Sequence, residues 1–358
     1  TLSRTRRDDM STSVRARRWG IVLAAGLMAA MAPVAEAAPG LGTVKHLRLP
    51  TSTDPHDVTT ASDGNVWFTV QGAFDPVTFL TPGSVARVTP RGDITEFAVC
   101  DFCITNDIVQ GPDGILYISD NDGQLRRIST SGEVQSSVPV PPVPPSETGS
   151  PLGGIAADST SIWFADSFNN RIGRFDVFTA VFTFYPVALN DGVDDVAVAG
   201  DGTVWFIGSE VTETDVIGAI GEIDPGVGVV SMTPLSGVAA GIAVAPNGTV
   251  WATEIFADLI ARLTPSGSGP HDLVEFPTAV GATPLGIAPA PDGNVWFTQN
   301  LRGNIARITQ GGVITEAGKV IDFADPKRPD PIGITIGANG DPWYAESLVD
   351  SVATFKLR

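Results

Sequence analysis

A single histidine stands where its neighbours would support acid–base chemistry. His56 follows a proline in the stretch DPHDVTTASDGNVWFTV at 54–70, and Asp57 comes directly after it. A carboxylate beside an imidazole orients the ring and raises its pKa, which suits a general base or a metal ligand. Related stretches return six more times, but only this copy has histidine at that place. The other interpretation of His56 is a channel-lining residue bonded to backbone groups.

Carboxylates recur near the first apolar run of this stretch and at the end of its second run. Mg²⁺ and Ca²⁺ take oxygen ligands, so these side chains are candidates for a divalent-metal site. The candidate metal ligands are Asp57, Asp107, Glu254 and Glu346. Glu346 is also expected to assist His56 in catalysis. The other interpretation is that these carboxylates are solvated or cap strand-end N–H groups.

Other residues at the same places, and in one long loop, are candidates for ligand contact. The polar candidates are Asn106, Asp166, Asp194, Gln299 and Asp330. Phe74 and Phe79 join them from the loop at 71–83, because exposed apolar side chains favour ligand or partner contact. A second long loop, at 208–217, is expected on the same face.

The elements that would position these residues follow from a repeat of 42 to 49 residues. Its anchors are Trp67, Leu116, Trp163, Trp205, Trp251, Trp296 and Trp343. In six of the seven units an Asp-Gly or Asn-Gly pair precedes the anchor, which is a strong hairpin signal. Two further runs of strand character complete each unit. Four short strands per unit without helical periodicity are typical of a β-propeller blade.

Seven units predict an all-β fold, a seven-bladed β-propeller of four-stranded blades, as one domain over residues 38–358. The last unit ends without a fourth strand, whereas residues 43–51 resemble the fourth strand of the other units. We therefore expect the N-terminal strand to pair with the last blade and close the ring, which removes an exposed strand edge. Closure would bring His56 close to Glu346 and Asp330.

The predicted ring places the candidate residues at one end of a central channel. Because the Asp-Gly hairpins fall at one end, first-strand starts and second-strand ends should converge at the other. The mouth is expected to be lopsided, since blades 1, 2 and 4 begin with polar residues and blades 5 to 7 with apolar ones. The tryptophan anchors are expected to pack between blades.

The first 37 residues have the pattern of a secretory signal peptide. Basic residues precede the apolar run WGIVLAAGLMAAMAPV, and AEA at 35–37 predicts cleavage near Ala37. Met10 is the expected start of synthesis, and the export route, Sec or Tat, stays open. No other segment is apolar enough to span a membrane, so we expect a secreted or extracytoplasmic monomer.

Charge and cysteine content restrict the partners further. The chain has a net charge of −18, and residues 38–358 alone carry 16 basic and 37 acidic side chains. Such a surface repels phosphate backbones, so nucleic acid is excluded as an expected partner. The only cysteines are Cys100 and Cys103. Outside the cell this C-x-x-C spacing favours a small loop disulfide over a redox or metal site.

The best-preserved unit, PLGIAPAPDGNVWFTQNLRGNIARITQGGVITE at 284–316, resembles the streptogramin B lyase (virginiamycin B lyase) family of seven-bladed propellers. The resemblance implies a lyase that opens a cyclic depsipeptide without water, using Mg²⁺ and a histidine base. It further implies histidines at the first-strand starts of the last two blades and a glutamate from a second strand. Glu346 matches the glutamate, but Leu285 and Ile332 stand at the histidine positions.

Two functions from different classes remain. The first is an exported propeller that binds a small or cationic ligand at the acidic channel mouth, with or without a divalent metal. The alternative is a lyase of the resembling family, with His56 as base and Glu346 as a ligand of Mg²⁺. The sequence leaves open whether the protein is an enzyme, and it does not identify the ligand.

Overall fold

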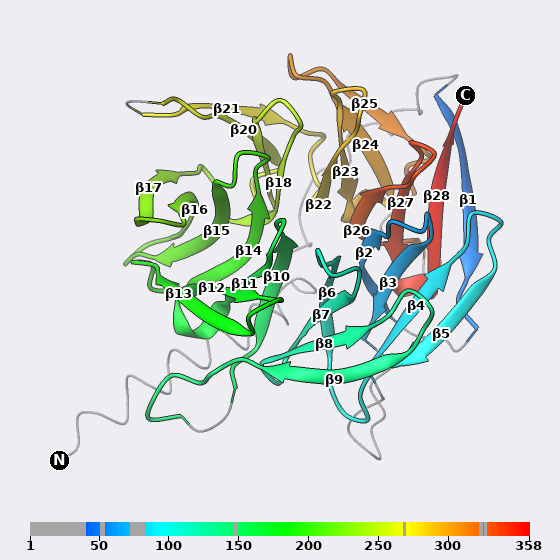
Figure 1. Ribbon diagram of the computed structural model, residues 1–358. Coiled ribbons are helices and arrows are strands. Elements are labelled where there is room, and N and C mark those ends of the chain that lie inside the picture. Colours follow the sequence, from blue (N-terminus) through cyan, green and yellow to red (C-terminus); the bar gives the residue numbers. More distant parts are fainter. Residues whose placement is uncertain are drawn as a thin grey trace, which may run out of the picture.

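Residues 41–50, 54–71, 83–146, 149–267, 270–321, 325 and 328–358 are described by the computed structural model. In these residues, seven antiparallel sheets of four strands surround a central axis (Figure 1). The innermost strand of each sheet contacts the innermost strand of the next sheet all the way round the ring. The predicted all-β, seven-bladed propeller is therefore confirmed.

The blades are numbered from the first complete sheet in the sequence. Blade 1 has β2 (Pro55–Thr60), β3 (Val66–Val70), β4 (Ser84–Val88) and β5 (Ile94–Ala98). Blade 2 has β6 (Thr105–Gln110), β7 (Leu116–Asp120), β8 (Gln124–Ile128) and β9 (Val134–Pro139). Blade 3 has β10 (Leu152–Ala157), β11 (Ser161–Asp166), the 3-10 helix η1 (Ser167–Asn169), β12 (Arg171–Asp176) and β13 (Val181–Pro186). Blade 4 has β14 (Gly192–Val198), β15 (Val204–Val211), β16 (Val216–Asp224) and β17 (Gly228–Pro234).

The remaining blades complete the ring. Blade 5 has β18 (Ala239–Val244), β19 (Val250–Glu254), β20 (Leu259–Thr264) and β21 (Asp272–Pro277). Blade 6 has β22 (Pro284–Pro289), β23 (Val295–Gln299), η2 (Asn300–Arg302), β24 (Asn304–Ile308) and β25 (Ile314–Ala317). Blade 7 has β26 (Pro331–Ile336), β27 (Pro342–Glu346), η3 (Ser347–Val349), β28 (Ser351–Leu357) and, as its outermost strand, β1 (Gly42–Arg48).

The first hairpin of each blade has the predicted turn chemistry, and blade 3 shows how its exception is accommodated. Gly64 of the Asp-Gly pair in blade 1 has φ +80°, a conformation that glycine adopts without strain. Blade 3 lacks such a glycine. There, Asp158 accepts the backbone N–H groups of Thr160 and Ser161, so its side chain stabilises the turn.

The cores lie between blades, because each anchor packs against strands of the following blade. Trp163, for example, contacts a buried cluster that includes Val193 and Phe206 of blade 4. The prediction that the tryptophans are core residues is confirmed. The predicted anchor of blade 2 is off by one residue: Tyr117 pairs with Val109 as Trp67 pairs with Thr59, so Tyr117 and not Leu116 is the equivalent residue.

The N-terminal strand closes the ring as predicted. β1 pairs antiparallel with β28 over seven residue pairs, from Gly42 opposite Leu357 to Arg48 opposite Ser351. Figure 1 shows β1 in blue beside β28 in red, although they come from opposite ends of the sequence. Leu49, which is 3% exposed, packs with blade 1 and blade 7 residues in one cluster.

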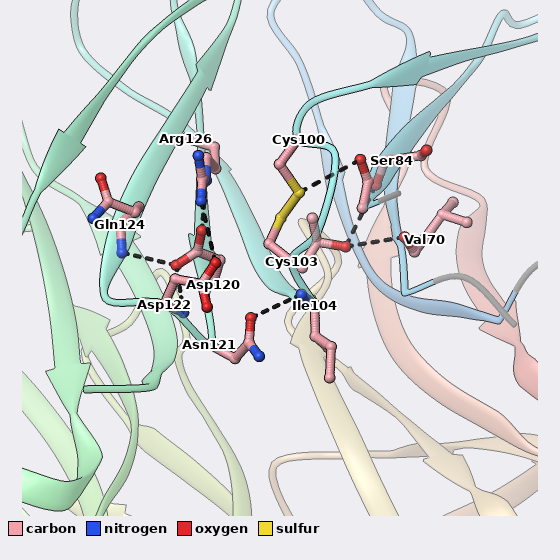
Figure 2. Close-up of a disulfide and its surroundings, with 12 residues drawn as sticks. Val70, Ser84, Cys100, Cys103, Ile104, Asp120, Asn121, Asp122, Gln124 and Arg126 are labelled. Carbon is pink, nitrogen blue, oxygen red and sulfur yellow. Dashed lines mark hydrogen bonds and ion pairs between the residues drawn. A yellow bond between two sulfur atoms is a disulfide. The ribbon is translucent and has the colours of Figure 1, made fainter. Parts of the chain in front are cut away.

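Cys100 and Cys103 form a disulfide in the connection between blades 1 and 2, as the sequence predicts (Figure 2). The bridge packs against Gly83, where an added Cβ would lie 2.7 Å from both sulfur atoms. The next residues tie the connection to both blades: Thr105 donates to the carbonyl of Val70 in blade 1. The disulfide therefore belongs to the packing of this connection.

Candidate functional site

The innermost strand of every blade is irregular at its start. In blade 1 the register of β2 against β3 shifts between Pro55 and Val58, and corresponding shifts occur in the other six blades. Such a β-bulge takes residues out of the ladder and redirects their side chains. His56 and Asp57 occupy the bulge in blade 1, at the end of the channel where the sequence placed the candidate residues.

Hydroxyl groups of the second strands hold the bulges in place. Thr69 Oγ1 accepts the backbone N–H of Asp57 at 2.8 Å and donates to the carbonyl of Asn106 in blade 2 at 2.8 Å. Ser119, Thr253 and Thr298 make the same two bonds in their blades. Each of these hydroxyls joins one blade to the next, so the bulge positions are fixed by the ring as a whole.

Three bulges carry an aspartate, and these side chains bond to backbone groups of adjacent strands. Asp107 accepts the N–H of Ile108 and, at 2.7 Å, that of Ile155 in blade 3. Asp195 accepts the N–H of Val196 in its own blade at 2.7 Å and that of Ile242 in blade 5 at 3.1 Å. These two carboxylates therefore act as links between neighbouring blades.

Glycines in other blades make room for the aspartates. A Cβ added at Gly154 would lie 1.8 Å from Oδ1 of Asp195, and one added at Gly333 would lie 2.4 Å from Oδ1 of Asp57. Oδ1 of Asp57 accepts the N–H of Val58, and its carboxyl group also bonds to that of Asp107. The alternation of aspartate and glycine is thus a packing requirement.

Burial and mutual repulsion shift the titration of all three carboxyl groups. Burial, opposed by hydrogen bonds, raises the pKa of Asp57 to about 7. Burial and the charge of Asp107 raise the pKa of Asp195 to about 8, and burial with the charge of Asp57 raises the pKa of Asp107 well above its usual range. At neutral pH the cluster holds protons that isolated carboxylates would have lost.

His56 has an unused acceptor. Its Nδ1 is buried and has no hydrogen-bond partner among the described residues, while a contact with the backbone of Asn106 engages the ring elsewhere. Burial lowers the pKa of His56, and the nearby charge of Asp54 and the contact with Asn106 only partly oppose this effect. The expectation that carboxylate neighbours raise this pKa is wrong, because desolvation of the ring outweighs them. His56 is therefore a neutral imidazole with a free lone pair.

The seam between blades 1 and 7 brings further carboxylates to the mouth. Asp54 accepts a hydrogen bond from Ser347, and Asp330 accepts the N–H of Leu348. Burial raises the pKa of Asp330 to about 6, with Asp54 adding repulsion and Arg328 opposing it. The acidic residue that acts on His56 at this seam is Asp54, whereas the sequence analysis had named Glu346 and Asp330.

Asp54 is the residue of this seam that the sequence analysis overlooked. A signal was present, because Asp54-Pro55 before β2 repeats the pattern of Asp330-Pro331 before β26. Asp195, which follows Asp194 directly, was not among the candidate site residues, and the structure places it in the bulge cluster. Asp194 itself keeps partial exposure beside it.

Side chains at the second-strand ends are held by hydrogen bonds to nearby residues. Oε2 of Glu346 accepts hydrogen bonds from His46 Nδ1 at 2.8 Å and from Ser351, which lie on the two outer strands of blade 7. This hydrogen bond raises the pKa of His46. The backbone of Glu346 lies opposite Pro331, so this strand end does meet a strand start as predicted, but Oε2 of its carboxylate is directed along the blade toward β28 and β1.

The side chains at the other strand ends also bond to nearby groups. Asp166 forms an ion pair with Arg171 at 2.6 Å, and Gln299 bonds to Asn304. Glu254 accepts the N–H of Gly237 at 2.6 Å, and burial followed by the charge of Glu275 raises the pKa of Glu254 to about 7. Each of these side chains bonds within its blade or to the chain leading into it. One side-chain oxygen of Glu254, Gln299 and Glu346, Oε1 in each case, is buried without a hydrogen-bond partner among the described residues.

The predicted metal ligands are not gathered in one place. Across the described ranges, His, Cys, Asp and Glu side chains form no group of three or more arranged to hold a metal ion. Asp57 and Asp107 belong to the bulge cluster, whereas Glu254 bonds to Gly237 before β18 and Glu346 bonds to His46 on β1. These residues do not fit the Mg²⁺ that the family resemblance implies, and no chemical step is derived through it.

The remaining predicted site residues are Asn106, Phe74 and Phe79. The amide of Asn106 donates to the carbonyl of Leu152 in blade 3 at 2.8 Å, so it links blades. Phe74 and Phe79 lie outside the described residues. Among the described residues, no helix has the length and apolar character required to cross a membrane.

Fold and site together define a class: a seven-bladed β-propeller, closed by its N-terminal strand, with a polar seam of His56, Asp54 and Asp330 at one mouth of the channel. The sequence profile of the virginiamycin B lyase family matches residues 43–271, and the chain belongs to this family. No curated protein sequence gives a significant match.

Solved structures show the same fold at low sequence identity. A streptogramin B lyase structure superposes with a TM-score of 0.73 at 22% identity, covering 89% of this chain and 98% of the other. A catalytically inactive virginiamycin B lyase from Staphylococcus aureus with quinupristin gives 0.70 at 22% identity, covering 88% and 99%. Kuenenia stuttgartiensis hydrazine synthase gives 0.66 at 14% identity, covering 88% and 98%. At these identities the likeness concerns the fold alone.

Proposed function

We propose that this protein is an exported propeller that binds a small amphiphilic amine at the mouth of its channel, without a metal. The observation that carries the proposal is the unpartnered, buried Nδ1 of His56. A buried acceptor without a partner costs free energy, roughly 1–3 kcal/mol, which a ligand's N–H group would recover. The neutral state of His56 suits it to accept a proton-bearing nitrogen rather than to repel a cation.

The surroundings of His56 support a cationic ligand with an apolar body. Asp54 and Asp330 supply negative charge at the seam. Beside this seam, the corresponding starts of blades 6 and 7 carry Leu285 and Ile332, both partly exposed. A protonated amine beside the carboxylates and a hydrocarbon part beside the aliphatic residues would match this division.

The alternative is a lyase acting on a cyclic depsipeptide, which membership of the family favours. In such an elimination, a base removes a proton from the carbon adjacent to the ester-bearing carbon, the C–O bond breaks, and an alkene and a carboxylate form. Among the described residues, His56 is the one histidine at the mouth, and it is therefore the candidate for the histidine base. Leu285 and Ile332 offer no proton acceptor, and Glu346 is engaged by His46 and Ser351.

Calorimetric titration with phenethylamine and with its N,N,N-trimethyl derivative tests the binding proposal. We expect the protonated amine to bind and the quaternary ammonium, which has no N–H, to bind more weakly. His56→Ala should reduce the affinity for phenethylamine by about tenfold, since a hydrogen bond to a charged group contributes roughly 1.5–3 kcal/mol. Asp63→Asn, at the opposite end of blade 1, is the matched control. Equal affinities for both probes, or no effect of His56→Ala, would refute the proposal.

Incubation with quinupristin, followed by mass spectrometry, tests the alternative. We expect the antibiotic to stay cyclic with and without Mg²⁺, because the two histidine positions of the family are aliphatic. Chromatographic separation is needed, since ring opening by elimination leaves the mass unchanged. A linear product that forms catalytically and is lost in His56→Ala would establish the lyase in place of the binding protein.

A further inference from the structure

Blade 4 differs from the other blades in its charge. Between Arg174 and Arg262 the chain contains twelve acidic residues and no lysine, arginine or histidine. This segment includes every strand of blade 4, from Gly192 to Pro234. Asp195 is buried in the channel and Glu222 contacts His271 of blade 5, so the negative charge that a partner meets on blade 4 comes from exposed carboxylates such as Glu210, Glu213 and Asp215.

A rigid hairpin extends blade 4. β15 and β16 have eight and nine residues, and they are the longest strands in the described chain. Asn190 fixes the hairpin from the side: its Nδ2 donates to the carbonyl of Val211 at 2.9 Å, and its Oδ1 accepts the N–H of Val211 at 2.7 Å. The turn is closed by Thr212, whose N–H donates to the carbonyl of Asp215 at 2.8 Å. The surface that this hairpin presents is thus ordered before any partner binds.

An apolar groove of about 170 Å³ lies at the base of the hairpin. Its lining is Ala188, Leu189, Glu210, Ile217, Gly218, Ala219, Met232 and Pro234. Ile217 and Met232 are each 38% exposed and lie together in the lining of this groove; exposed apolar side chains that gather in one place are typical of interaction sites. Glu210 stands opposite Ile217 in the ladder and places a carboxylate at the end of the groove.

The groove continues along an open strand edge. β17 is the outermost strand of its sheet, and Val230, Met232 and Pro234 alternate along it, so they share one side. Natural edge strands are usually protected by charged residues or by bulges, because unpaired N–H and C=O groups recruit further strands. β17 carries no charged residue. Its edge and the groove beside it are both suited to an extended chain.

We propose that blade 4 docks an extended segment of another protein, in which lysine or arginine alternates with apolar residues, as a fifth strand beside β17. Alternate side chains of an added strand point to opposite sides. The apolar set would enter the groove against Ile217 and Met232, and the basic set would meet the carboxylates of the blade. A second copy of this chain does not fit this role, because its net charge of −18 would oppose association. The inference concerns a different surface from the mouth and goes beyond the proposed function.

The test uses a fluorescein-labelled Lys-Val-Lys-Leu-Lys-Val-Lys peptide and fluorescence anisotropy with the whole protein. We expect saturable binding that weakens with added salt, and no binding of the peptide in which glutamate replaces lysine. Met232→Lys places a cation in the groove and should lower the affinity by about tenfold, as loss of a central contact does. Glu210→Gln, which leaves the groove shape unchanged, should lower it to a smaller extent.

Val181→Lys is the matched control, since Val181 is also exposed on an uncharged outermost strand, β13 of blade 3. It should leave the affinity unchanged if blade 4 is the site. Circular dichroism of each variant confirms the fold. The proposal would be overturned if the peptide still bound to Met232→Lys, or if Val181→Lys abolished binding. It would also be overturned if spermidine displaced the peptide when both were present at the same concentration of positive charge. Loss of peptide binding in Asp54→Asn would place the peptide at the mouth and would likewise refute it.

Discussion

A variant that begins at Pro50 should lose most of the thermal stability that a variant beginning at Leu41 retains. The shorter variant lacks β1, which contributes the whole outer ladder of blade 7, and the buried side chain of Leu49. Removing one buried leucine side chain alone costs about 2–5 kcal/mol. With the ladder and the contacts of Val44 and Leu47 also lost, we expect a decrease in Tm on the order of 10 °C.

The decrease should be specific to closure of the ring. A synthetic peptide of residues 41–50, added to the shorter variant, should restore part of the lost Tm, because the exposed edge of β28 remains available to it. The point variant His46→Ala keeps the strand and removes only the bond to Glu346, so its effect should be small by comparison. Equal melting temperatures of the two truncated proteins would show that β1 does not close the ring in solution.

The second large effect concerns pH. We expect the free energy of unfolding to increase as the pH falls from about 9 to about 5, with a rise in Tm on the order of 5–10 °C. The pKa of Asp57 is about 7 and that of Asp195 about 8 in the folded protein, and the pKa of Asp107 is raised as well. Between the ordinary pKa of aspartate and these values, the folded state binds protons that the unfolded state has released. Stability must therefore fall as the pH rises through this window.

Other groups modify this slope in known directions. The raised pKa of His46 has the same effect on stability. The stabilisation that His46 contributes is fully present at pH values below its pKa in the unfolded state, and it is lost as the pH rises through its pKa in the folded state. The lowered pKa of His56 acts oppositely, because the unfolded state binds the proton more readily and stability falls as the pH drops below about 6.5. The three channel aspartates outnumber His56, so we expect the net stability to fall as the pH rises.

Asp57→Asn is the variant that isolates the channel carboxylates. Oδ1 of Asp57 accepts one backbone N–H, and its other side faces the carboxyl group of Asp107, to which an amide could donate. The variant should therefore be more stable than the wild type at pH 8 and show a shallower dependence on pH. Asp272→Asn removes the same charge from an exposed position and serves as control. An unchanged slope in Asp57→Asn would show that the cluster is not the source of the effect.

The architecture could be predicted from the sequence alone. Asp-Gly turns, alternating strand patterns and the tryptophan anchors are local signals, and each was repeated often enough to reveal seven blades. The missing last strand and the matching segment at 43–51 were enough to predict closure, because every blade needs the same four strands. The disulfide followed from the spacing of Cys100 and Cys103 and the expectation of export. The predicted position of the anchor in blade 2 was one residue too early. Leu116 and Tyr117 are both buried, and only the pairing of the strands distinguishes them.

The chemistry of the site, in contrast, depended on the tertiary structure. Glu346 was expected at the mouth, but its carboxylate is held by His46, which is 300 positions away in the sequence. Asp57 and Asp195 influence each other electrostatically although they lie in blades 1 and 4. The pKa of His56 is lowered because the effect of burying the ring is larger than the effect of the nearby carboxylate of Asp54. Side-chain direction and desolvation depend on residues supplied by other strands and blades, so a local pattern locates a strand end but does not fix what its side chain meets.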